Sequence, residues 1–121
     1  MRNNAFVLFI AICCAACGDR VCNKEAVAQL FTYPVAIDGP LTWQDAEIRH
    51  ANLLREAGIS TDKPFGRKNS EWEDLKQNIA PGDCLFHYRS DEDSWENLSG
   101  REGYILIRRG KPIAGILVRV S

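Results

Sequence analysis

The stretch YILIRRGKPIAGILVRV, residues 104–120, decides the fold of this chain. It holds two runs of apolar and β-branched residues, 104–108 and 113–120. They are joined by Arg109-Gly110-Lys111-Pro112, a connection typical of a β-hairpin. Side chains alternate between the two faces of a strand. In the second run we therefore expect one alternating set to face the core: Ala114, Ile116, Val118 and Val120.

An earlier run, residues 84–89, has the same character. Alternation along a strand divides its side chains between two faces. One face carries Cys84, Phe86 and Tyr88, and the other carries Leu85, His87 and Arg89. Together with the hairpin, this run predicts a small three-stranded antiparallel meander.

The residues before the meander predict helices. Asn23 can cap a short helix that runs to residue 31, and Thr42 begins a longer helix that Gly58 ends. Ser70 opens a third helix, which stops before the turn signal Pro81-Gly82-Asp83.

Between the first two helices the sequence leaves the structure open. Residues 33–37 are either a short strand or an extended connection, and Asp38-Gly39-Pro40 predicts a turn. The fold class that we expect is α+β. Two or three helices pack on one face of the three-stranded antiparallel meander, in a single domain that spans residues 23–121.

The N-terminal segment has the pattern of a bacterial export signal. A basic start, Met1-Arg2-Asn3-Asn4, precedes the 12 apolar and small residues 5–16, which end at Cys14-Ala15-Ala16-Cys17. This run is too short to cross a bilayer as a helix, which takes about 20 residues. It resembles the lipobox of bacterial lipoprotein precursors, although Cys14 stands where that family usually has Leu.

The resemblance implies that residues 1–16 are removed as a signal peptide and that Cys17 becomes the acylated first residue. Residues 17–22 would form the lipidated N-terminus and a short tether. The protein would then be anchored in the bacterial cell envelope, facing the periplasm, with inner or outer membrane left open. Two alternatives are an ordinary secretory signal that leaves Cys17 as a thiol or disulfide partner, and a buried N-terminal element of a cytosolic protein.

The cysteines predict one disulfide in the exported domain. If Cys13 and Cys14 leave with the signal and Cys17 carries lipid, the remaining pair is Cys22 and Cys84. An even pair in an oxidising compartment favours a disulfide. The alternative, a redox or metal site, lacks a Cys-x-x-Cys motif in this part of the chain. We therefore expect no metal and no cofactor.

The charge of the exported domain argues against one class of partner. From residue 17 onward there are 14 Lys and Arg against 16 Asp and Glu, a formal net charge of −2. Domains that bind nucleic acid normally carry a basic face. We therefore expect no nucleic-acid partner.

The stretch WENLSGREGY, residues 95–104, is the most patterned part of the domain. With the hairpin that follows, it resembles the C-terminal segment of small bacterial exported proteins, and this resemblance implies no catalytic activity. We expect Trp95, Arg101 and Tyr104 to form a ligand or partner surface. The alternative role for Arg101 is a structural ion pair with a loop carboxylate, the commoner fate of such a charge. The nearby acidic residues do not make a calcium loop, because Trp95 stands where an oxygen ligand is needed.

Two functions are compatible with these patterns. The favoured one is a lipid-anchored, non-catalytic binding or structural module. It contacts the membrane through its lipid, and an envelope protein, polymer or small ligand through the 95–104 surface. The alternative is a small periplasmic enzyme that uses His50 or His87 with a nearby carboxylate. If these histidines are remote from each other, or buried without a cleft, the enzyme hypothesis loses its support.

Overall fold

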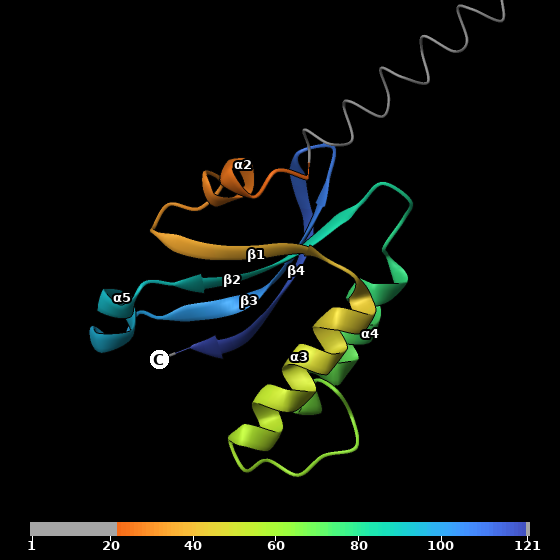
Figure 1. Ribbon diagram of the computed structural model, residues 1–121, viewed down its shortest axis with the longest axis vertical. Coiled ribbons are helices and arrows are strands. Elements are labelled where there is room, and N and C mark those ends of the chain that lie inside the picture. Colours follow the sequence, from red (N-terminus) through yellow and green to blue (C-terminus); the bar gives the residue numbers. More distant parts are fainter. Residues whose placement is uncertain (1–21, 121) are drawn as a thin grey trace, which may run out of the picture.

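Four antiparallel strands form the sheet in the part of the chain that the computed structural model describes, residues 22–120 (Figure 1). The sheet order is β1-β2-β3-β4, so strands adjacent in sequence are adjacent in space. The expected signal segment, Cys17 and most of the tether lie outside the described residues. The strand bounds are β1 Val35–Leu41, β2 Cys84–Ser90, β3 Arg101–Arg108 and β4 Lys111–Val120.

Helical segments accompany the sheet at several points. Within residues 22–120 there are four α-helices and a short 3-10 helix: α2 Lys24–Ala28, α3 Trp43–Glu56, η1 Gly66–Lys68, α4 Asn69–Gln77 and α5 Glu92–Glu96. Helices α3 and α4 lie together on one side, whereas α5 lies at the far end of β2 and β3 (Figure 1). One helix more than expected is present, because α5 forms just before and into the stretch predicted as a loop.

The fold class is α+β as expected, but the meander has four strands rather than three. The additional strand, β1, runs through Asp38-Gly39-Pro40, where the sequence predicts a turn. The register is irregular between Asp38 and Leu41, so these residues form a bulge within the strand. A Cβ at Gly39 would lie 2.8 Å from the Phe86 ring, and its φ of +137° suits glycine. The predicted turn is therefore wrong.

Two of the three predicted helix starts are confirmed. The side chain of Asn23 accepts a hydrogen bond from the backbone N–H three residues on, at 2.9 Å, and Thr42 does the same at 3.0 Å. Helix α3 ends just before Gly58, as expected. The predicted start at Ser70 is wrong, because α4 follows directly on η1 and begins at Asn69.

Helices α3 and α4 cover the main core on one face of the sheet. The rings of Phe65 and Trp72 stack with centroids 4.3 Å apart, and Tyr104 meets Phe65 edge-on at 5.3 Å. The buried members of this core are Ala46, Phe65, Trp72, Leu75, Leu85, Tyr104, Leu106 and Ile116.

The end of β4 departs from the predicted alternation. Val120 is expected in the core but is 55% exposed. The register between β3 and β4 shifts between the pairs Glu102–Arg119 and Gly103–Leu117. This bulge reverses the alternation, so that Arg119 rather than Val120 shares the face of Glu102.

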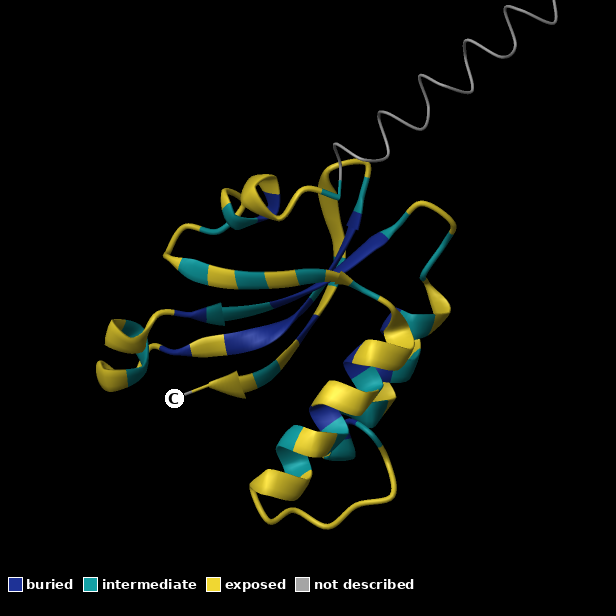
Figure 2. Cartoon of the chain, in the orientation of Figure 1, coloured by how far each residue is buried: buried dark blue, intermediate teal, exposed yellow. Residues whose placement is uncertain are grey.

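The opposite face of the sheet is covered by α2. Val27 packs there with Cys84, Phe86 and Ile107. The predicted disulfide between Cys22 and Cys84 is present, with Cα atoms 5.7 Å apart, and it ties the start of the described chain to β2. Burial is concentrated in β2 and β3, whereas β4 and α5 are largely exposed (Figure 2).

Candidate functional site

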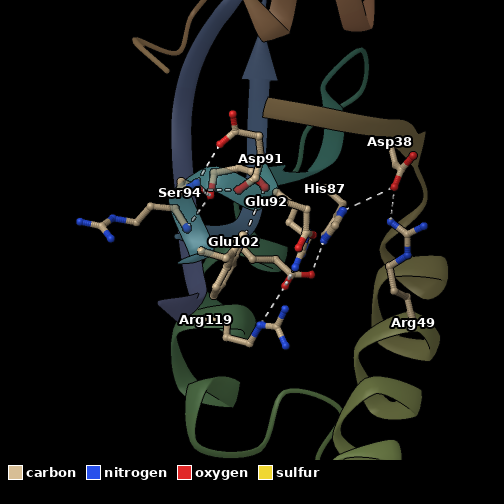
Figure 3. A network of polar contacts seen from close by, with 12 residues as sticks. Asp38, Arg49, His87, Asp91, Glu92, Ser94, Glu102 and Arg119 are labelled. Carbon is tan, nitrogen blue, oxygen red and sulfur yellow. Dashed lines mark hydrogen bonds and ion pairs between the residues drawn. The ribbon is translucent and has the colours of Figure 1, made fainter. Parts of the chain in front are cut away.

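A band of charged side chains crosses all four strands on the face that carries α3 and α4 (Figure 3). The strand register places Asp38 opposite His87, Arg89 opposite Glu102, and Glu102 opposite Arg119. Directly opposed residues of antiparallel strands share a face of the sheet. Side chains from four separate strands therefore converge on one region.

Glu102 is the centre of this region. Its side chain is only 8% exposed, and Oε2 lies 2.7 Å from Nε2 of His87. Oε1 is held by charge rather than by a hydrogen bond, with Nε of Arg119 at 3.1 Å and Nε of Arg89 at 4.0 Å. Burial opposes ionisation, but the His87 hydrogen bond and the two guanidinium charges outweigh it and lower the pKa of Glu102. The carboxylate is thus ionised at neutral pH.

His87 bridges Glu102 and the edge of the sheet. Because an ionised carboxylate only accepts hydrogen bonds, Nε2 of His87 carries the proton and donates it to Glu102. The other ring nitrogen, Nδ1, lies 3.5 Å from Asp38 without a hydrogen bond. The same Asp38 oxygen is 3.3 Å from a guanidinium nitrogen of Arg49 on α3. The band thus alternates positive and negative groups.

A partly exposed tryptophan lies beside the band. The guanidinium carbons of Arg89 and Arg119 lie 5.0 and 4.7 Å from the ring centroid of Trp95 in α5. Nε1 of Trp95 donates to the carbonyl of Ser90 at 3.2 Å, which fixes the ring. A Cβ at Gly100 would overlap this ring, so glycine is required for its close packing. We call Trp95 with Arg89 and Arg119 the Trp95 platform.

The predicted partner surface is divided by the structure. Trp95 belongs to the platform, and the exposed Arg101 donates to the Gly100 carbonyl at 3.1 Å. Tyr104, in contrast, is 1% exposed, and its burial raises its pKa. Its inclusion in an exposed surface is corrected, because it alternates into the core beside Leu106.

The two histidines are near each other but play different parts. Their rings both meet Tyr104, with centroid distances of 6.2 Å for His50 and 5.2 Å for His87. His50 is 4% exposed and stacks on Phe65 at 4.4 Å. Burial lowers the pKa of His50, against the attraction of Glu102. His50 is therefore a neutral packing residue.

The surroundings of His87 do not make a nucleophilic site. Among the described residues its polar partners are the carboxylates Glu102 and Asp38, and it forms no hydrogen bond with a Ser, Thr or Cys. A nucleophile needs a base within hydrogen-bond reach. Neither of the two surface hollows defined by described residues is lined by His50 or His87. The geometry favours a positioning role for His87.

Sequence patterns missed most members of this site. Glu102 offered a usable signal, since it alternates with Tyr104 and Leu106 and so falls on the core face of β3, where a carboxylate needs partners. Asp38 and Arg119 offered none. They reach Glu102 and His87 only through a register that contains a bulge in each edge strand.

Comparison with known proteins gives no family for this chain. No family model, curated protein or solved structure matches it. None of the helices within residues 22–120 is long and apolar enough to span a bilayer. The same residues hold no group of three side chains suited to binding a metal ion.

Proposed function

We propose that the protein is a lipid-anchored binding module of the bacterial envelope, without catalytic activity of its own, and that its partner contacts the Trp95 platform. The observation that carries this proposal is the pair of guanidinium groups over one partly exposed indole, both paired with the buried Glu102. Tryptophan and arginine are the residue types most enriched at binding hot spots.

The platform is held in place before a partner arrives. Glu102 restrains Arg119 and Arg89, while Arg89 also pairs with Glu92 at 2.8 Å. Side chains that are already ordered lose less entropy on binding. Such an arrangement suits recognition of a partner better than it suits catalysis.

Two features support the envelope location. The lipobox resemblance ends at Cys17, and the domain after it contains a Cys22–Cys84 disulfide. Disulfides persist in compartments such as the periplasm and are rare in the cytosol. Both observations fit an exported, anchored domain.

The anchor is tested by replacing the acylated cysteine. Cys17→Ser should release the protein into the soluble fraction or leave it as an unprocessed precursor, and mass spectrometry of the wild type should find a lipidated N-terminus at Cys17. An unmodified chain that starts elsewhere contradicts the lipoprotein assignment.

The binding surface is tested by photocrosslinking in intact cells. A photoreactive amino acid at Leu98, 78% exposed next to the platform, should yield a discrete adduct. The matched position is Ile48 on α3, 62% exposed, and it should yield none. Arg89→Ala should weaken the Leu98 adduct. Absence of an adduct, or equal adducts at both positions, contradicts the proposal.

A further inference from the structure

The two edges of the sheet differ in how well they are protected. β1 carries a bulge and Pro40, and α2 packs against it. These are features that prevent further strand pairing. β4 is the opposite edge, ten residues long, with Pro112 only at its second position and a largely exposed surface. β4 is therefore the open edge.

A hollow lies beside the second half of β4. Its walls are Arg67 and Lys68 of η1 and residues 117–120 of β4, and its volume is about 330 Å³. Arg67 makes no ion pair among the described residues, whereas Lys68 pairs with Glu71 at 3.4 Å. Arg119 contributes a third cation to the same walls. The hollow is thus open, positively charged and bordered by a strand edge.

We propose that the β4 edge accepts an extended, acidic polypeptide segment of a partner as a fifth strand of the sheet. This inference rests on the proposed binding function and gives the partner a chemistry. In such pairing the main-chain hydrogen bonds of the edge supply affinity, and side-chain contacts supply specificity. Exposed Ile113 and Leu117 offer apolar contacts along the strand. Arg67, Lys68 and Arg119 face the acidic side chains.

The charge of the strand selects between two occupants. From Gly103 to Ser121 the sequence contains four cations and no Asp or Glu. Antiparallel pairing of β4 with a second copy would bring Lys111, Arg119 and Arg67 of both copies together, and like charges across strands destabilise a pair. An acidic strand meets the same groups with attraction. The cations therefore oppose self-association and favour an acidic partner.

The test uses two synthetic peptides and the full-length lipidated protein in detergent micelles. The probes are capped octapeptides of alternating Val and Glu or of alternating Val and Lys, each carrying a fluorophore. We expect fluorescence anisotropy to report binding of the Glu peptide only. Amide hydrogen exchange should slow in residues 113–120 when it binds. No binding of the Glu peptide at millimolar concentration, or binding without slowed exchange in β4, overturns the inference.

Two charge variants sharpen the test. Arg67→Glu should weaken binding of the Glu peptide about tenfold, a typical effect of reversing one charge at an interface. Lys24→Glu makes the same change on α2, which packs on the opposite edge strand, and should leave the affinity unchanged. An equal effect of both variants, or a concentration-dependent dimer paired through β4, overturns the inference.

Failure of this inference is distinguishable from failure of the binding function. In-cell adducts at Leu98 without peptide binding at β4 would leave the binding module intact and remove the acidic strand. Peptide binding at β4 without any in-cell adduct would do the reverse.

Discussion

Glu102→Gln tests whether one buried carboxylate organises the charged band. Glutamine keeps the volume of Glu102, and its carbonyl can still accept the hydrogen bond from His87. Its NH₂ group, however, replaces the oxygen that lies 3.1 Å from Arg119. A donor would then face the donors of Arg119 and Arg89 in a site that is only 8% exposed at residue 102.

The size of the effect follows from burial. A buried donor without an acceptor costs about 1–3 kcal/mol. The ion pairs add little, about 0–1 kcal/mol each, because Arg119 and Arg89 are 47% and 34% exposed and solvent screens them. We expect a loss of about 2–3 kcal/mol in the free energy of unfolding. For a domain of this size that lowers the Tm by about 10–20 °C.

The measurement is urea unfolding at pH 7, followed by tryptophan fluorescence, since Trp72 is fully buried. The matched control is Glu92→Gln, which removes another partner of Arg89 from a side chain that is 77% exposed. This control should change the free energy of unfolding by less than about 0.5 kcal/mol. A comparably small effect of Glu102→Gln would refute the reasoning.

The effect of this substitution should also depend on pH. The pKa of Glu102 is lowered in the folded state, so its ionised form stabilises the fold above the ordinary range of a Glu. This contribution is lost as the pH falls through the lowered folded-state pKa. The difference between wild type and Glu102→Gln should therefore be largest near neutral pH and shrink below about pH 4. A difference that is constant from pH 3 to 7 would contradict the assigned ionisation.

Two further predictions concern the covalent and packing supports of the fold. Replacing both Cys22 and Cys84 by Ala should cost about 4 kcal/mol in the free energy of unfolding, because their separation of 62 residues closes a long loop; a loss below 1 kcal/mol in urea unfolding would argue against this. Gly100→Ala should displace the Trp95 ring, which a Cβ overlaps, at a cost of about 1–3 kcal/mol. A red-shifted fluorescence and a weaker photocrosslink at Leu98 should accompany it, and an unchanged spectrum would count against this packing.

The sequence is informative about the fold wherever a local pattern determines structure. The caps at Asn23 and Thr42 depend on one side chain and the next turn of backbone, so they could be predicted. Strand β2 likewise follows from its own alternation. The residues Asp38-Gly39-Pro40 show the limit. They have turn composition, yet pairing with β2 and contact of Gly39 with Phe86 hold them in a bulged strand.

The site could be predicted only in part for the same physical reason. Trp95 and Arg101 stand out locally, and both remain at the surface. Tyr104 also stands out, but its alternation with Leu106 places it in the core. The convergence of Glu102 with Arg119 depends on a bulge whose effect is seen only once both strands are aligned.

The presence of Glu102 on a core face links the two proposed surfaces. Leu106 and Tyr104 alternate with it on β3, so an apolar residue would suit the same face. Buried ion pairs are often no more stabilising than apolar packing of similar volume. Holding the guanidinium of Arg119 is a function that an apolar side chain would lose. Arg119 both lies over Trp95 and lines the hollow beside β4. A strand that pairs with β4 and draws on this charge therefore acts directly on the Trp95 platform, and the two surfaces should bind one partner together.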